Sequence, residues 1–308
     1  MRAVVIGVGH LGKHHARILA AMPGVMLAGV IDSNQERAGQ IAAERGTTAY
    51  ADVRDVPGKI DVAVVAVPTE SHAAIATTLI AAGIHTLVEK PVTQTVAEAD
   101  ALIAAAKAKG VVFAVGHSER FNPAVAAARP YLQDPRFIEV HRLGQFPDRS
   151  LDIDVVLDLM IHDIDLILSL VPSEVEGVEA VGVPVLTPRI DIANARVRFA
   201  NGCIANLTAS RISREPVRKI RFFQQDSYVS IDTAAREVEI WRLVPQPTGP
   251  PKIGGGKLEV AGDEALKGEL EDFLGAVRDG RPPTVTGEQG RAALALATRI
   301  VELMGHQL

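Results

Sequence analysis

A glycine-rich run near the start of the chain has the spacing of a phosphate-binding turn. Gly7, Gly9 and Gly12 fit the pattern G-x-G-x-x-G, between a short apolar run and a helical segment. In such a turn the first glycine allows the bend, the second lets the backbone approach a pyrophosphate, and the third lets helix and strand pack closely. The N–H groups at the start of the helix attract the phosphates. The motif predicts dinucleotide binding by Gly7, Gly9, His10, Leu11 and Gly12.

An acidic residue follows at the position expected for a ribose contact. Asp32 ends the second predicted strand, 25 positions after Gly7. Its carboxylate can accept hydrogen bonds from the adenosine ribose and repels a 2′-phosphate, so we expect NAD rather than NADP. Ser33 and Arg37 are expected to join this site. A Rossmann-like domain that binds nothing, or another nucleotide, is the alternative.

Two further polar loops follow predicted strands. Val67-Pro68-Thr69 comes after the third long strand, with His72 in the next helix, and Glu89-Lys90-Pro91 comes after the following strand. Open α/β sheets bind ligands at the carboxyl ends of their strands. We therefore expect cofactor contacts from Val67, Pro68, Thr69, His72, Glu89 and Lys90, with solvated loops as the alternative.

A carboxylate and an imidazole lie four residues apart on one predicted helix. Asp158 and His162 therefore share a helix face. A carboxylate beside an imidazole can orient the ring and stabilise its protonated form, and histidine can accept a proton near neutral pH. The pair fits a general base, and a surface hydrogen bond is the alternative.

The same segment is crowded with acidic side chains, which raises the question of a metal. Asp158, His162 and Asp165 fall on one helical face, and further aspartates lie nearby at Asp152, Asp154 and Asp163. Histidine-rich or thiolate ligation is missing, however. We expect no metal, and we expect Asp165 to be structural.

The elements that position the first group of residues alternate between strand and helix. The predicted strands are nearly continuous apolar runs, as in a buried parallel sheet; they cover residues 3–7, 26–32, 61–67, 86–89 and 111–115. The helical segments between them cover residues 11–21, 35–45, 72–82 and 96–109. This alternation predicts an α/β fold, with an N-terminal Rossmann domain of doubly wound parallel sheet over residues 1–118.

Residues 119–308 follow a different pattern and form the predicted substrate-binding and oligomerisation domain. Strands follow one another from about Phe137, including residues 195–199, 203–211, 218–225, 228–232 and 238–243. One helix, 155–171, interrupts them, 245–256 is expected to be a mobile loop, and helices at 264–279 and 288–304 close the chain. We expect an α+β domain with an open, mostly antiparallel sheet, whose last helix could pack back on the first domain.

The composition excludes several classes of protein. The 308 residues carry a net charge of −5, which argues against nucleic acid as a partner. We find no run of 18 apolar residues, so no membrane span is expected. The single cysteine, Cys203, rules out an intrachain disulfide. A cytoplasmic location is the default expectation.

Taken in order, these motifs resemble the Gfo/Idh/MocA oxidoreductases. The resemblance rests on the glycine turn with His15, Pro68-Thr69-x-x-His72, Glu89-Lys90-Pro91, Asp158-x-x-x-His162 and a C-terminal run at 272–280, so it covers essentially the whole chain. It implies NAD(P)-dependent oxidation of a secondary alcohol on a sugar or cyclitol. It also implies a homodimer or homotetramer built through the C-terminal sheet.

The resemblance implies three catalytic residues. His162 would act as general base, Lys90 would stabilise the developing alkoxide and relay a proton, and Asp158 would orient the imidazole. Lys90 and His162 would also contact the substrate. Which of the two accepts the proton is left open.

Within the family, the chain resembles a sugar-nucleotide branch. Residues 153–157 lack the glycines common before the catalytic aspartate, and Met160 replaces a later one. Residues 116–123 and 156–165 resemble enzymes that oxidise C3 of UDP-N-acetylglucosamine. This implies substrate contacts from Glu119, Arg120, Phe121 and Asn122, with an ion pair at the domain junction as the alternative for Arg120.

Other functions and contacts remain open at this stage. A dehydrogenase of an unactivated polyol or sugar, of the inositol or glucose type, is one alternative, and a non-catalytic NAD-binding sensor is another. A group of cationic side chains could bind a diphosphate or could simply keep a strand edge in contact with water, and we slightly favour the second interpretation. The group consists of Arg211, Arg214, Arg218 and Lys219.

Overall fold

The computed structural model describes residues 1–146 and 153–305, which form two compact units. The first unit comprises Met1–Ser118 and Leu266–Leu294, and the second comprises Glu119–Ala265 and the chain from Ala295 onward. The two units are described separately below.

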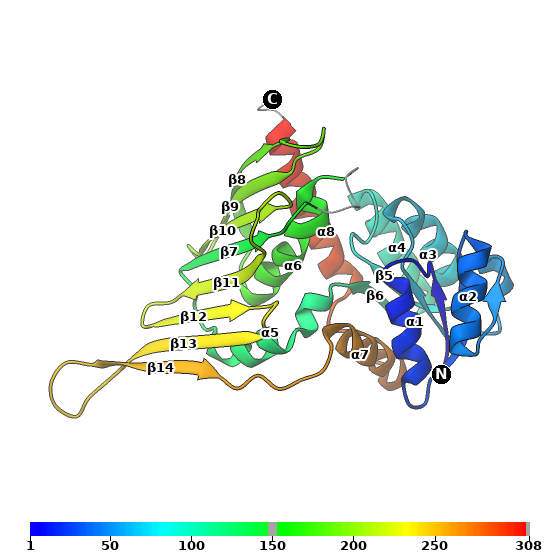
Figure 1. The fold of residues 1–308 in the computed structure, drawn as a ribbon, viewed down its shortest axis with the longest axis horizontal. Helices are drawn as coiled ribbons and strands as arrows, with labels where there is room; N and C mark the ends of the chain where they lie inside the picture. The colour runs from blue at the N-terminus through cyan, green and yellow to red at the C-terminus, as the bar shows by residue number, and fades with distance from the viewer. Residues whose placement is uncertain (147–152, 306–308) are drawn as a thin grey trace. The chain divides into compact units, whose positions relative to one another are not determined.

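The first unit contains a six-stranded parallel sheet in the order β3-β2-β1-β4-β5-β6. Figure 1 labels its strands β5 and β6 and the helices around them. Its strands are β1 (Arg2–Ile6), β2 (Met26–Ile31), β3 (Ala49–Tyr50), β4 (Val62–Val65), β5 (His85–Glu89) and β6 (Phe113–Gly116). The order is that of a Rossmann sheet, so the predicted fold is confirmed. The two-residue edge strand β3 is the only one of these six that the sequence did not indicate.

Helices connect the parallel strands, as the alternation predicted. They are α1 (Gly12–Ala21), α2 (Gln35–Arg45), α3 (His72–Ala81) and α4 (Val96–Lys109), with short 3₁₀ turns η1 (Val53–Asp55) and η2 (Thr69–Ser71). Helix α4 begins at a capping box between Thr95 and Glu98 and ends at Gly110 in the left-handed conformation. Such local signals explain why the sequence locates these helices well.

Helix α7 (Ala265–Asp279) and the first part of α8 (Gly287–Gly305) belong to the first unit. From the sequence we expected residues 119–308 to form one domain, with only the last helix able to pack on the first. The apolar face of α7 buries Leu270 and Phe273 in the same core as Ala3 and Leu19. Burial of an amphipathic face, rather than position in the chain, therefore decides where α7 belongs.

The second unit contains an eight-stranded sheet in the order β14-β13-β12-β11-β7-β10-β9-β8. Its strands are β7 (Phe137–Leu143), β8 (Val175–Val183), β9 (Ile192–Phe199), β10 (Ile204–Ser210), β11 (Val217–Phe223), β12 (Ser227–Asp232), β13 (Glu237–Val244) and β14 (Lys252–Leu258). Only β7 and β10 pair in parallel. The predicted open, mostly antiparallel sheet is confirmed.

One loop prediction in this unit is wrong over its second part, from residue 252 onward. Residues 245–256 were expected to form a loop, but β14 begins at Lys252 and pairs with β13 along its length. Gly255 has a φ of +144°, and a Cβ atom there would collide with the carbonyl oxygen of Ile240. Gly255, one of the glycines that suggested a loop, is instead required by the close approach of two strands.

The helices of the second unit include an irregularity that the sequence did not reveal. They are η3 (Ser118–Phe121, from the last residue of the first unit), α5 (Pro123–Ala128), η4 (Arg129–Tyr131), the π-helical turn η5 (Val156–Met160) and α6 (Ile161–Leu170). The expected continuous helix over 155–171 therefore begins as a π-turn, a feature that often occurs at functional sites. Among the described helices, none combines the length and apolarity needed to cross a bilayer.

Two histidines of the first unit, the buried His72 and the half-buried His85, give its stability a predictable pH dependence. Burial lowers the pKa of both His72 and His85. The Nδ1 atom of His85 accepts the N–H of Val112 at 2.9 Å, which requires that nitrogen to be unprotonated. The unfolded chain takes up protons at these histidines below about pH 6.5, whereas the folded chain resists them, so stability falls as the pH falls through that value.

We expect the melting temperature to drop by a few degrees between pH 7.5 and pH 5.5. His85→Asn keeps an acceptor for Val112 but removes the titrating ring, so it should match the parent near pH 8 and lose less stability on acidification. Thermal unfolding followed by circular dichroism at several pH values measures both. Equal slopes for parent and variant would contradict the assignment to His85.

Candidate functional site

The glycine turn has the geometry that its three glycines predict. Gly7 has a φ of +82°, and a Cβ atom there would lie 2.5 Å from the carbonyl oxygen of Ala66. A Cβ atom on Gly12 would collide with the carbonyl oxygen of Gly7, whereas one on Gly9 would meet nothing within 4 Å. The turn is thus closed against the protein at Gly7 and Gly12 and open above Gly9. This open cradle at the start of α1, whose first turn holds no acidic residue, fits a pyrophosphate.

Asp32 is held by a full set of donors at the end of β2. Its carboxylate accepts the N–H groups of Val8 and Asn34, both at 2.8 Å, and two bonds from Arg37 at 3.1 and 2.7 Å. Burial opposes the negative charge, but the hydrogen bonds outweigh it and keep the pKa of Asp32 below its ordinary value. Four donors occupy about the whole capacity of a carboxylate. Arg37, whose side chain is 45% exposed, is the donor of this set that another hydrogen-bonding group can most readily replace.

His72 connects the two other predicted cofactor loops. Its Nδ1 lies 2.9 Å from the carbonyl oxygen of Pro91, and its Nε2 lies 2.9 Å from that of Val67. Burial lowers the pKa of His72, and a neutral imidazole has one N–H, so it donates to one carbonyl at a time. The ring therefore holds the loop after β4 beside the loop after β5. Thr69, at the start of η2, belongs to the first of these loops.

The loop after β5 carries the predicted lysine. Lys90 is half-buried, and its N–H donates to the carboxylate of Glu89 at 3.2 Å. Glu89 is 6% exposed and also contacts the Nε2 atom of His15 at 2.8 Å. The peptide bond between Lys90 and Pro91 is cis. Glu89 is thus directed into the protein, and Lys90 is the side chain of this loop that remains accessible.

The predicted proton-transfer pair lies at the junction of η5 and α6. Asp158 is in the π-turn and His162 is in the first turn of α6, and both are half-buried. The backbone N–H of Asp158 donates to the carbonyl oxygen of Asp154 at 3.1 Å, which starts this turn. The two side chains therefore come from one continuous helical segment, with the π-turn setting the direction of Asp158.

Buried ion pairs fix the inward side of this segment. Asp163 accepts two hydrogen bonds from Arg142 of β7, each of 2.8 Å, and Arg142 also donates to Glu119 at 3.0 Å. Burial alone would lower the pKa of Arg142, but the charges of Asp163 and Glu119 outweigh it and raise that pKa. Arg120 donates to Asp165 at 2.8 Å, with both side chains at most 5% exposed. The aspartates at 163 and 165 therefore act as anchors of α6.

The predicted substrate residues at 119–122 are partly committed to this network. Glu119 and Arg120 use side-chain atoms in the ion pairs just described. Asn122 caps α5 through the N–H of Ala124 and donates to Glu119 and to the carbonyl oxygen of Thr233. Phe121 is half-buried at the end of η3. For Arg120, the geometry favours an ion pair, which was the alternative to substrate binding. The partner is Asp165, which lies in the second unit like Arg120 itself.

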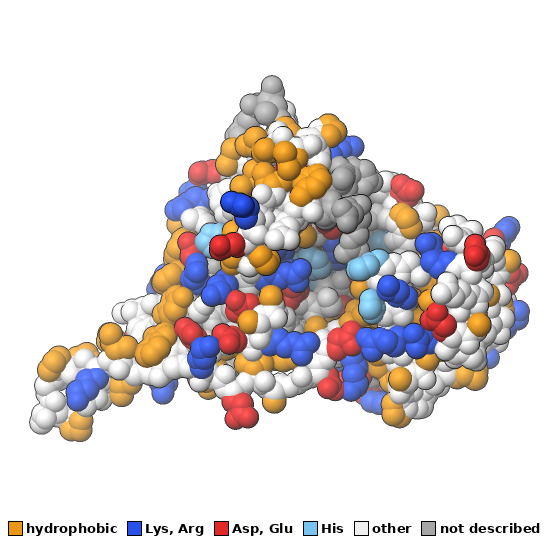
Figure 2. Space-filling view, viewed as in Figure 1, with side chains coloured by type: hydrophobic (Ala, Val, Ile, Leu, Met, Phe, Trp, Pro, Cys, Tyr) orange, Lys and Arg blue, Asp and Glu red, His pale blue; other side chains and the backbone are white. Residues whose placement is uncertain are grey.

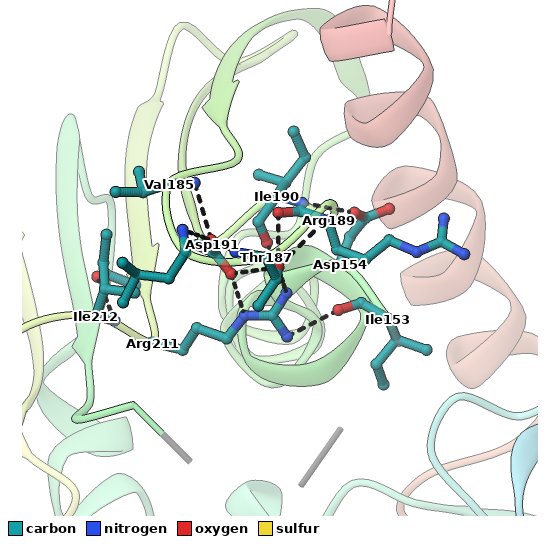
Figure 3. Close-up of polar contacts among 11 residues, drawn as sticks. Ile153, Asp154, Val185, Thr187, Arg189, Ile190, Asp191, Arg211 and Ile212 are labelled. Atoms are coloured by element: carbon teal, nitrogen blue, oxygen red, sulfur yellow. Dashed lines mark hydrogen bonds and ion pairs between the residues drawn. The ribbon is translucent and has the colours of Figure 1, made fainter. Parts of the chain in front are cut away.

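A second buried network holds the start of η5 (Figure 3). Asp191 accepts three successive backbone N–H groups, of residues 185, 186 and 187, and a bond from Arg211 at 2.8 Å. Arg211 reaches on to the carbonyl oxygen of Ile153 at 2.8 Å, and Asp154 accepts the N–H of Ile190 at 2.9 Å. The segment that leads into Asp158 is thus fastened to the loop between β8 and β9.

This network changes the interpretation of the cations near residue 211. Arg211 is 2% exposed and serves Asp191, so it is a structural residue. Lys219 lies 3.8 Å from Asp232, while Arg214 and Arg218 are exposed. Three of the aspartates that raised the question of a metal, at positions 154, 163 and 165, accept hydrogen bonds from other residues of the protein. Asp152 lies outside the described residues.

Several residues of these sites gave no signal in the sequence. Arg142, Asp191 and Glu269 lie far along the chain from their partners and in no recognisable motif. Among the described residues, the one group of three potential metal ligands lies elsewhere, at His15, Glu89 and Glu269. His15 belongs to the glycine motif and Glu89 to the Glu89-Lys90-Pro91 motif, but neither motif indicated that the two side chains meet.

Comparison with known proteins agrees with the geometry. Residues 1–117 match the oxidoreductase family with an NAD-binding Rossmann fold, and residues 126–226 match the GFO/IDH/MocA C-terminal domain. The chain is 43% identical over 302 residues to UDP-N-acetylglucosamine 3-dehydrogenase of Acidithiobacillus ferrooxidans, covering 97% of this chain and 96% of that protein. It is 27% identical to scyllo-inositol 2-dehydrogenase (NAD(+)) of Bacillus subtilis, covering 93% and 89%.

Solved structures show the same relationship. The crystallised UDP-N-acetylglucosamine 3-dehydrogenase of Acidithiobacillus ferrooxidans superposes with a TM-score of 0.93 at 41% identity, covering 99% of this chain and 98% of that one. Levoglucosan dehydrogenase in complex with NADH and levoglucosan shares the fold, with a TM-score of 0.91 at 22% identity and coverage of 100% and 98%. With matched profiles in both domains and a full-length relative above 40% identity, the chain belongs to the Gfo/Idh/MocA family of NAD-dependent oxidoreductases.

Proposed function

We propose that this protein oxidises the C3 hydroxyl of UDP-N-acetylglucosamine to a ketone, with NAD as the hydride acceptor. The observation that carries this proposal is 43% identity along 97% of the chain to an enzyme named for that reaction. The inositol dehydrogenase relative is more distant, at 27% identity. A sugar nucleotide and a dinucleotide cofactor fit a cytoplasmic enzyme, which is the location we propose.

The proposed chemistry uses three side chains. His162 accepts the proton of the C3 hydroxyl as the C3–H bond breaks, and bound NAD would supply the hydride acceptor. Lys90 stabilises the negative charge that develops on the oxygen, because a cation near an alkoxide lowers the barrier. Asp158 stabilises the imidazolium that forms. The two electrons of the C3–H bond leave with the hydride, and the hydroxyl proton moves to His162, which leaves a C3 ketone.

Two other functions predict different results. A dehydrogenase of a free polyol would use the same three residues, but it would oxidise inositol or glucose rather than the sugar nucleotide. A non-catalytic NAD sensor would bind cofactor without reducing it and would need neither Lys90 nor His162. The presence of both, together with Asp158, favours an enzyme.

Reduction of NAD in the presence of UDP-N-acetylglucosamine tests the proposal, with an aminotransferase coupled to remove the keto product. His162→Ala should lower kcat about 10²- to 10⁴-fold and Lys90→Ala about 10²- to 10³-fold. Both variants should still bind NADH, followed by its fluorescence. Lys109→Ala, an exposed lysine at the end of α4, is the control and should match the parent. Turnover of inositol or glucose without turnover of the sugar nucleotide would reject the substrate.

Cofactor choice depends on Asp32 in this proposal. Asp32→Ala removes the carboxylate that excludes a 2′-phosphate and releases Arg37, a cation that favours one. The ratio of kcat/KM for NAD over NADP should fall about tenfold or more. Asp100→Ala, at an exposed aspartate that pairs with Arg291, should leave the ratio unchanged. An unaltered ratio in Asp32→Ala would contradict the ribose role.

We further propose that the protein forms a homodimer or homotetramer through the eight-stranded sheet. A row of aromatic side chains crosses four strands in register, from Phe137 through Phe223 and Tyr228 to Trp241. Neighbouring ring centroids lie 5.5 and 5.2 Å apart for the first two pairs. Figure 2 shows apolar side chains gathered over β13 and β14, where Leu243 and Ile253 are 50% and 75% exposed. An exposed apolar surface of this kind is typical of an interface.

A charge placed in the aromatic row should separate the subunits. Trp241→Glu is expected to shift the protein to a smaller species in analytical ultracentrifugation, because a buried carboxylate without a partner is costly at an interface. Leu186→Glu alters another exposed apolar residue, in the loop after β8, and is the control that should sediment like the parent. A monomeric parent, or an oligomer unaffected by Trp241→Glu, would contradict this interface.

A further inference from the structure

Three buried titratable side chains of the first unit meet where α1, β5 and α7 come together. His15, Glu89 and Glu269 are 0%, 6% and 2% exposed, and one potential ligand atom from each lies within 4.8 Å of the others. They are distant in the chain, and the proposed reaction uses none of them directly. A group of charged side chains this deeply buried is costly unless its members support one another.

The bonds of Glu89 connect this cluster to the lysine loop. Its Oε1 lies 2.8 Å from His15 Nε2, and its Oε2 accepts the N–H of Lys90 at 3.2 Å. A Cβ atom on Gly116 would lie only 2.8 Å from the Glu89 carboxyl carbon, so the wall beside the carboxylate is bare backbone. The carboxylate is therefore held by the imidazole on one side and by the Lys90 backbone on the other.

The position of His15 in α1 places the same cluster next to the cofactor turn. His15 lies one turn into α1, three residues after Gly12, whose backbone touches Gly7 so closely that no side chain fits. The backbone N–H of His15 donates to the carbonyl oxygen of Leu11, within the turn, at 3.3 Å. Glu269 adds a second carboxylate to the cluster from α7. The imidazole of His15 thus links the lysine loop to the helix that follows the glycine turn.

A metal ion could in principle occupy the same three residues, but the distance argues against it. Ligand atoms held about 2.0–2.1 Å from a tetrahedral zinc ion lie roughly 3.3 Å apart. The separation of 2.8 Å between His15 Nε2 and Glu89 Oε1 is instead that of a hydrogen bond to a charged group.

We propose that His15 is a positioning residue for the reaction, which acts through Glu89 to hold Lys90 at its working position beside the cofactor turn. This inference rests on the proposed role of Lys90. Loss of the imidazole leaves a buried carboxylate oxygen without its donor, and the loop that carries Lys90 then loses its fixed end.

The test compares His15→Leu with His15→Gln, whose amide nitrogen can occupy the place of Nε2. His15→Leu should lower kcat about ten- to a hundred-fold while NADH binding changes little, and His15→Gln should recover most of the loss. In a Lys90→Ala background, His15→Leu should have almost no further effect, because both changes disable the same group. His14→Leu, at the adjacent and less buried histidine of α1, is the control. Additive losses in the double variant would overturn the proposal.

A second readout is independent of the sugar substrate. Hydrogen–deuterium exchange of the peptide spanning residues 86–95 should be faster in His15→Leu than in His15→Gln or the parent, since the Lys90 N–H bond depends on Glu89. Glu89→Gln should show the same faster exchange if His15→Leu does not fold. Unchanged exchange in the variant that folds would overturn the proposal even if UDP-N-acetylglucosamine proves to be the wrong substrate. A stoichiometric divalent cation, removed by chelator with the same change in exchange, would also overturn it in favour of a metal site.

Discussion

The close contact between backbone segments at the glycine turn is the constraint on which the first unit depends. Gly7 lies against the carbonyl oxygen of Ala66 at the end of β4, and Gly12 lies against Gly7. Because no side chain fits at either position, β1, α1 and the loop after β4 are placed by contact of their main chains. Asp32 and His72 then bond to those same segments, through Val8 and Val67. The cofactor site is therefore built largely from backbone, and its side chains refine it.

In the second unit, buried ion pairs hold the helical segment that bears Asp158 and His162. Three arginines, at 120, 142 and 211, direct their guanidinium groups at aspartates whose side chains are at most 3% exposed. Arginine suits this role because its planar fork can satisfy two carboxylate oxygens at once. Such pairs add little net stability compared with apolar packing, but they tolerate few alternative arrangements. Their benefit here is a single orientation for the helical segment that bears Asp158 and His162.

Local patterns explain what could be predicted from the sequence, and distant contacts explain what could not. The glycine turn, the apolar strands and the capped helices are written in neighbouring residues, so the Rossmann unit could be assigned in detail. The bond between His15 and Glu89 joins residues 74 positions apart, and Glu269 reaches the same cluster from α7, so no spacing rule indicates it. Glycines at 254–256 resembled a loop because composition does not reveal that two strands approach closely there. The burial of Arg120 and Arg211 could not be predicted either, since a buried and a solvated arginine look alike in a sequence.

The π-turn at Val156–Met160 bears on how such a site can change during evolution. A π-turn is an α-helix that has gained one residue, and each residue rotates the direction of a side chain by about 100°. The buried anchors at Asp163 and Asp165 lie after the turn, so gain or loss of that residue would redirect Asp158 without disturbing them. A single insertion could therefore have altered the reacting face of the helix while its core packing stayed as inherited. The helix thus carries Asp158 and its buried anchors on separate stretches, so the direction of the one can change without loss of the other.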